Sequence, residues 1–148
     1  MASEEMPPSD PNRLERTRRF FFALADRDTE MASAELLETA TYHMPGNNPS
    51  AGTFRGRREI VAHFQRLFEL TSGSEAVKWV DWMDGTDLVA TLLRAHLQAG
   101  LIELECELLF VVGFDASGPI SDVRLFLEDQ ACVDRFLAQL PTTSTLRA

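Results

Sequence analysis

The chain has 148 residues, of which 45% are hydrophobic, which is enough for one domain with a proper core. Its 14 basic and 23 acidic residues give a formal net charge of −9, which repels phosphate backbones and anionic lipid surfaces. We therefore expect neither nucleic acid nor a membrane as a partner.

Three segments are predicted along the chain. Residues 1–9 carry acids and prolines with little to bury, so we expect a disordered lead-in. Residues 10–140 form the predicted domain, and residues 141–148 a flexible tail. The first residues have acids where a signal peptide needs a basic and then an apolar segment, and the apolar runs are short for a membrane span. We expect a cytoplasmic protein.

Two helices are predicted at the start of the domain. The first begins with Asp10 as N-cap and Pro11 in the first turn. A shorter helix, capped by Asp28 or Thr29, is predicted to run through Leu37. In the first helix, Leu14, Thr17, Phe21 and Leu24 recur at helical spacing.

The stretch from Thr41 to Gly56, TYHMPGNNPSAGTFRG, predicts a strand that runs into a polar loop. His43 lies where the strand meets the loop. The next segment, GRREIVAHFQRLFEL, predicts an amphipathic helix. Its apolar stripe consists of Ile60, Phe64, Leu67 and Phe68.

Four strands are predicted next. EAVKWVDWMDG is the first, with Trp79 and Trp82 expected on opposite faces. DLVATLLRAHLQ and LIELECELLFVVGFD follow as a hairpin around Ala99 and Gly100. ISDVRLFLED is the last strand, and a helical segment follows it.

The predicted hairpin register pairs His96 with Glu103 and Arg94 with Glu105. Both pairs, together with Glu107, then lie on the convex face of the sheet. The opposite face is apolar and is expected to cover the helices. It consists of Val89, Thr91, Leu93, Ala95, Leu97, Ile102, Leu104, Cys106, Leu108 and Phe110.

The order of elements and the motif of Pro45–Gly46 followed by Gly52-x-Phe54-x-Gly56 resemble the SnoaL-like polyketide cyclase family, within the ketosteroid isomerase and nuclear transport factor 2 (NTF2)-like superfamily. The resemblance covers about residues 13–137. It implies an α+β cone in which a curved antiparallel sheet wraps a long N-terminal helix and two shorter helices around a central pocket. It also implies a homodimer through the convex sheet face.

The resemblance implies a mostly apolar pocket that holds an apolar small molecule. At the positions where ketosteroid isomerases carry a tyrosine, a base and a protonated acid, this chain has Phe21, Met44 and Phe110. The usual isomerase groups are therefore missing. The expected lining consists of Phe21, Met44, Leu93, Leu104, Leu108, Phe110, Val123 and Leu127.

Two residues are candidates for acid–base chemistry. His43 is the histidine that the strand pattern can direct inward, and Asp129 ends the alternating inner face of the last strand. Each also has a structural alternative, because His43 can bond a loop carbonyl and Asp129 can cap the last helix. Arg94 with Asp129 is kept as an epoxide hydrolase-like alternative that the resemblance suggests. His63 is assigned to the surface or to packing.

The favoured function is a cofactor-independent cyclase or isomerase that acts on an apolar polyketide-like or polycyclic molecule. Cyclases of this family need no metal or organic cofactor, and we expect none. The alternatives are a small-molecule binding protein and a structural dimerisation domain. Cys106 and Cys132 lack metal or redox spacing and are expected to be free thiols.

Overall fold

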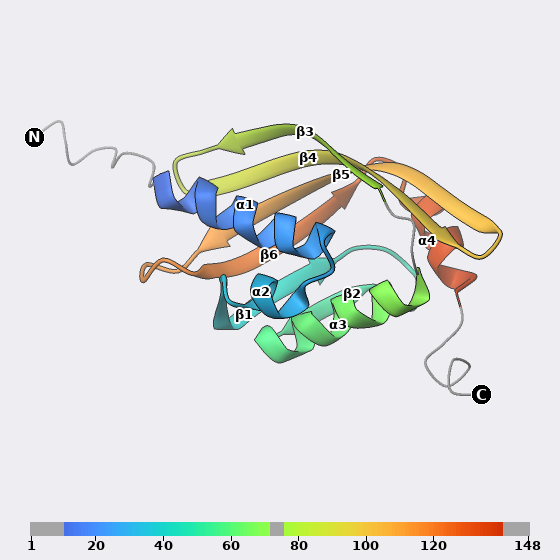
Figure 1. Ribbon diagram of the computed structural model, residues 1–148, viewed down its shortest axis with the longest axis horizontal. Coiled ribbons are helices and arrows are strands. Elements are labelled where there is room, and N and C mark those ends of the chain that lie inside the picture. The colour runs from blue at the N-terminus through green and yellow to red at the C-terminus, as the bar shows by residue number, and fades with distance from the viewer. Residues whose placement is uncertain (1–10, 72–75, 141–148) are drawn as a thin grey trace, which may run out of the picture.

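The computed structural model describes residues 11–71 and 76–140, which form four helices and one six-stranded sheet (Figure 1). Residues 1–9 and 141–148, the predicted lead-in and tail, lie outside the described residues. No helix among the described residues is long and apolar enough to cross a membrane. The elements are α1 (Pro11–Ala25), α2 (Thr29–Ser33), β1 (Leu36–Met44), β2 (Gly52–Arg55), α3 (Arg57–Leu70), β3 (Ala76–Asp84), β4 (Leu88–Ala99), β5 (Ile102–Phe114), β6 (Ile120–Leu127) and α4 (Gln130–Ala138).

The sheet has the strand order β2-β1-β6-β5-β4-β3 and curves over α1 (Figure 1). The predicted α+β cone is confirmed, as are the helices now labelled α1, α3 and α4. The description of the sheet as antiparallel is wrong for one pair, because β1 and β6 run parallel. These two strands are joined through α3 and four further strands, and so long a connection allows a parallel pairing.

The second helix is shorter than predicted. Asp28 caps it, with the backbone N–H of Met31 donating to its carboxylate at 3.0 Å, but the helix ends at Ser33. Leu36 instead starts β1 and pairs with Ile120 of β6. Both side chains are fully buried, so sheet pairing overrides the helical spacing of residues 31–37.

The β4–β5 hairpin has a register two residues away from the predicted one. Arg94 pairs with Glu107 and His96 with Glu105, and Gly100 and Leu101 form the turn. Gly100 has a φ of 63°, which a residue with a side chain adopts only at a cost, so the turn begins at the glycine.

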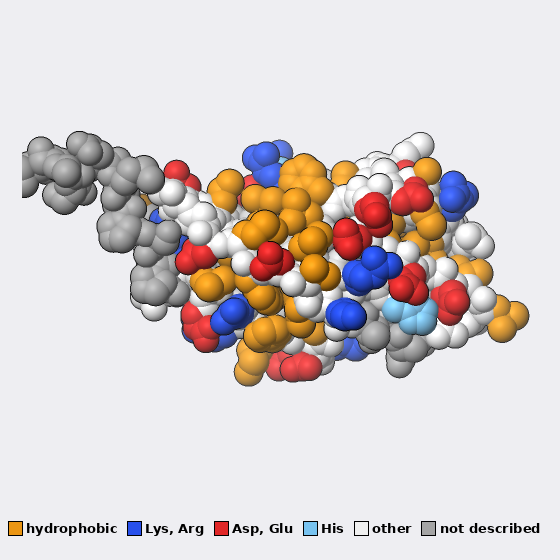
Figure 2. Space-filling model, turned by 90° about the horizontal axis from the view of Figure 1, so that it is seen from above, with side chains coloured by type: hydrophobic (Ala, Val, Ile, Leu, Met, Phe, Trp, Pro, Cys, Tyr) orange, Lys and Arg blue, Asp and Glu red, His pale blue; other side chains and the backbone are white. Residues whose placement is uncertain are grey.

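A shift of two residues leaves every side chain on its predicted face of the hairpin. The charged residues lie outside, where His96 Nε2 is 3.2 Å from Glu103 and an Arg94 nitrogen is 3.5 Å from Glu105, now as diagonal neighbours. Figure 2 looks onto the molecule from above and shows charged side chains and a histidine interleaved toward one end of this face.

Trp79 and Trp82 lie on the same face of β3, so the predicted opposite placement is wrong. Trp79 pairs with Leu93 and Asp81 with Leu92, which leaves Val80 as the extra residue of a bulge. The extra residue reverses the alternation. The two indoles stack with ring centroids 5.0 Å apart, against the aromatic residues of α1.

The loop between β1 and β2 is fastened to α4. The side chain of Asn48 donates to Asp134 at 2.7 Å, and that of Gln130 donates to the Pro45 carbonyl at 3.3 Å. Gly46 has a φ of 116°, and a Cβ there would collide with the side chains of Gln130 and Asp134. These contacts hold the end of β1 beside α4.

Candidate functional site

Two adjoining cavities lie between the sheet and the helices. The first, the α1 cavity, has a volume of about 130 Å³ and reaches Phe21 and Leu24 of α1. The second, the α4 cavity, has a volume of about 90 Å³ and reaches Val133 and Leu137 of α4. They form one candidate site, because five residues line both of them: Phe64, Leu67, Leu97, Leu108 and Phe110.

Most of the predicted lining residues border these cavities. Seven of the eight do so, and Val123 does not, because it is packed into the core beside Tyr42 with 1% of its surface exposed. The three positions that lack the isomerase groups all lie in the walls. Phe21 and Leu93 line the α1 cavity, Met44, Leu104 and Leu127 the α4 cavity, and Leu108 and Phe110 both.

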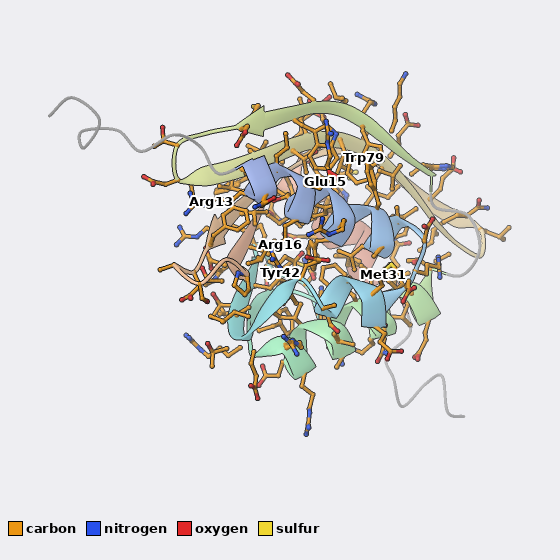
Figure 3. The ribbon with its side chains drawn as sticks, turned by 60° about the vertical axis from the view of Figure 1, so that its left-hand side comes forward. Arg13, Glu15, Arg16, Met31, Tyr42 and Trp79 are labelled. Carbon is orange, nitrogen blue, oxygen red and sulfur yellow. The ribbon has the colours of Figure 1, made fainter. Side chains whose placement is uncertain are left out.

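Aromatic rings dominate the α1 side of the site. The ring of Phe21 lies 4.7 Å from that of Phe110 and 6.3 Å from that of Trp79, measured between centroids. Figure 3 shows Trp79 on the β3 side of α1 and Tyr42 on the β1 side. The two residues therefore border the interior from different ends of the sheet.

Few polar groups reach the cavity walls. Among the described residues, the ionisable members of the lining are Tyr42 and Cys106, both in the α4 cavity. Burial raises the pKa of the Tyr42 hydroxyl and raises the pKa of the Cys106 thiol to about 11, so both groups are neutral at pH 7. The Thr71 hydroxyl donates to the Leu67 carbonyl at 2.8 Å. The walls thus offer neutral donors and no carboxylate or imidazole.

His43 does not face the cavities, so its predicted inward direction is wrong. Tyr42 and Met44 occupy the inner face of β1, and alternation places His43 on the outer face, with 39% of its side chain exposed. Its Nε2 lies 2.9 Å from Asp122, and its Nδ1 lies 3.2 Å from the Thr53 hydroxyl.

Asp122 is the centre of this outer-face network. Thr41 donates to its carboxylate at 2.7 Å, and Arg124 donates to it at 2.9 Å. Partial burial acts to raise the pKa of Asp122, but these hydrogen bonds and the charges of His43 and Arg124 hold it below its usual value. The network joins β1, β2 and β6 across the sheet.

Asp129 caps α4 and lies outside both cavity walls. Its carboxylate accepts a hydrogen bond at 3.0 Å from the backbone N–H of Cys132, which is the structural alternative given above. Arg94 points to the outer face and approaches Glu105 and Glu107. The epoxide hydrolase-like pair of Arg94 and Asp129 is therefore wrong.

Tyr42 is a wall residue that the sequence analysis missed. The signal was present, because a strand with Met44 on its inner face also directs Tyr42 inward, two residues earlier. Adjacent residues of a strand cannot both face inward, so an inward Met44 is incompatible with an inward His43.

No group of three or more His, Cys, Asp or Glu residues that could hold a metal ion occurs in residues 11–71 and 76–140.

A family model described as SnoaL-like domain matches residues 17–121. The chain belongs to the SnoaL-like domain family. Comparison with curated proteins gives no match. The fold is consistent with a small-molecule cyclase, an isomerase or a binding protein, and family membership alone does not choose among them.

Several solved structures have a fold similar to that of this chain. Bal32a, from a soil-derived mobile gene cassette, is 26% identical with a TM-score of 0.79, covering 84% of this chain and 95% of that one. An NTF2-like protein from Burkholderia thailandensis is 22% identical with a TM-score of 0.74, covering 87% and 98%. Rv0760c from Mycobacterium tuberculosis, in complex with estradiol-17β-hemisuccinate, is 16% identical with a TM-score of 0.64, covering 77% and 92%.

His63 is a buried neutral histidine in this SnoaL-like domain. It is 2% exposed, and its ring lies 4.3 Å from that of Phe54 and 5.3 Å from that of Tyr42. Its buried Nε2 has no hydrogen-bond partner among the described residues. Burial, and then the charge of Arg66, lower the pKa of His63 to about 4. Of the two assignments given to His63, the surface or packing, its burial supports packing.

This lowered pKa predicts a loss of stability in acid. The unfolded chain takes up a proton at His63 near pH 6.5 and the folded chain only near pH 4. The destabilisation caused by His63 is absent above pH 6.5 and grows as the pH falls. At pH 4 it lowers the free energy of unfolding by roughly 3 kcal/mol. Asp122 adds a loss in the same direction, because its lowered pKa favours the folded state only while it is ionised.

We expect His63→Phe to lose less stability than the wild type between pH 7 and pH 4, measured by urea unfolding at a series of pH values. Leu101→Phe, at the exposed tip of the β4–β5 hairpin, is the control and keeps the wild-type slope because it removes no titratable group. An equal slope in His63→Phe and the wild type contradicts the prediction.

Proposed function

We propose that the protein binds a small, neutral, apolar molecule in the joined α1 and α4 cavities. The observation that carries this proposal is the chemistry of the walls, which are aliphatic and aromatic apart from a few neutral groups. A charged ligand would lose its hydration there without gaining an ion pair. An apolar ligand gains the contact area that the walls provide.

The volumes suggest the size of the ligand. An apolar cavity of about 150 Å³ is large enough for benzene, whereas drug-sized ligands occupy about 300 Å³ or more. The α1 cavity has about 130 Å³ and the α4 cavity about 90 Å³. We therefore propose a ligand with one ring and short substituents. A polycyclic ligand requires the shared side chains to move apart.

Binding is favoured over acid–base catalysis because His43 and Asp129 both lie outside the walls. Cyclase or isomerase activity in this site would depend on confinement of the substrate, which can promote ring closure by limiting its conformers. Rv0760c, which has a similar fold, forms a complex with a steroid derivative, and this supports the proposal that the present chain binds a small molecule.

The proposal is tested by toluene binding, measured by calorimetry, in Leu108→Trp and Leu109→Trp. Leu108 lines both cavities, so its replacement fills the site and is expected to weaken binding by about tenfold or more. The matched control, Leu109→Trp, carries the same change on the opposite face of β5 and is expected to bind toluene normally. Absence of toluene binding by the wild type, or equal binding by both variants, would contradict the proposal.

We also propose that the chain forms a homodimer through the outer face of the sheet. Leu92, Leu109 and Phe126 form a row across β4, β5 and β6, because Leu109 pairs with both of the others. They border a hollow of about 210 Å³, and Phe126 is 51% exposed. An apolar row in the middle of a mixed surface is suited to a self-complementary interface.

Sedimentation velocity tests the dimer. We expect the wild type to sediment at about twice the 16.6 kDa mass of the chain, and Phe126→Glu to shift it toward the monomer by placing a charge in the interface. Leu101→Glu, at the fully exposed tip of the β4–β5 hairpin, is the control and stays dimeric. A wild-type protein that remains monomeric at micromolar concentration would refute this interface.

A further inference from the structure

Tyr42 is a buried residue that carries a hydroxyl and lines an apolar space. Tyr42 is 2% exposed, and its ring packs between β2 and α3, with centroids 6.1 Å from Phe54 and 5.2 Å from Phe64. The same residue forms part of the wall of the α4 cavity, beside Met44. The ring is therefore held in place by its neighbours.

No hydrogen bond found among the described residues involves the Tyr42 hydroxyl, and burial is the one cause of its raised pKa. The adjacent imidazole does not serve as acceptor, since the buried Nε2 of His63 is itself without a partner in the described part of the chain. The other hydroxyl in the walls, that of Thr71, already donates to Leu67. A hydroxyl at such a wall gains a hydrogen bond when a ligand brings an acceptor to it.

A ligand in the α4 cavity can supply the missing acceptor. The walls provide no cation for a carboxylate, so a neutral oxygen is the suitable partner. A ligand alcohol that accepts from Tyr42 would leave its own hydrogen without an acceptor. A carbonyl oxygen needs only a donor, and a phenol is a good one.

We infer that Tyr42 donates a hydrogen bond to the carbonyl oxygen of a small neutral ligand, and that the ligand class is a monocyclic or short-chain ketone, aldehyde or ester. This inference rests on the proposed binding function and adds the polar group that the ligand carries. Tyr42 would orient the ligand by its oxygen, while Met44, Leu104 and Leu127 contact the apolar remainder.

The test uses two probes of nearly equal shape, acetophenone and α-methylstyrene, which differ by a carbonyl oxygen in place of a methylene group. Their dissociation constants are measured by calorimetry for the wild type and for Tyr42→Phe, which removes only the hydroxyl. We expect the preference for the ketone to fall about three- to tenfold in Tyr42→Phe, with the affinity for the alkene within about twofold of the wild type.

Infrared spectra of bound acetophenone give a second measurement. Loss of the hydrogen bond is expected to move the carbonyl stretch to higher frequency in Tyr42→Phe. Thr91→Val is the matched control, because it removes a buried hydroxyl that donates to the Asp81 carbonyl at 3.1 Å and Thr91 lines neither cavity. It is expected to keep both the preference and the frequency. Thermal unfolding checks that the variants remain folded.

Each other outcome overturns the inference in a different way. An unchanged preference and frequency in Tyr42→Phe, with both probes still bound, refutes the Tyr42 contact but leaves the proposed binding function intact. An equal fall of the preference in Tyr42→Phe and Thr91→Val also refutes the Tyr42 contact, because Thr91 lines neither cavity. If neither probe binds to the folded wild type, the proposed function fails together with the inference.

Discussion

The long ladder between β4 and β5 is the constraint on which the rest of the molecule depends. Its inner face is apolar, and Leu93, Leu97 and Leu108 from that face line the cavities. Its outer face carries Arg94 with its carboxylate neighbours. A slip of one residue would exchange the two faces and bury charges at a cost of several kcal/mol. The ladder therefore determines both where the helices pack and why the interior is apolar.

Much of this arrangement could be predicted from the sequence, because it depends on alternation. The predicted hairpin register was two residues away, yet the faces were right, since alternation has a period of two. Alternation failed where the chain adds a residue, as at the Val80 bulge that turns both indoles inward. It was misapplied at His43, whose neighbours Tyr42 and Met44 take the inner face. The shorter α2 depends on pairing with β6, which local spacing does not reveal.

The distribution of polar groups connects the fold to the proposed function. Charged residues, including the network around Asp122, lie on the outer face of the sheet. The cavity walls contain Tyr42 and Cys106, whose pKa values are raised by burial so that both are neutral. Such a site binds by shape and apolar contact, and a single donor can orient the ligand. Burial keeps the Tyr42 hydroxyl neutral, and it also lowers the pKa of His63, which costs stability in acid. Both residues lie against Phe64, so the wall of the site and the stability of the domain share one aromatic cluster.

The most direct measurement is a crystal structure determined under xenon pressure, because xenon enters dry apolar cavities without specific polar contacts. We predict xenon between Phe64, Leu108 and Phe110, where the α1 and α4 cavities share their wall. Ordered water that is hydrogen-bonded throughout this space, with no xenon bound, would contradict an apolar binding site.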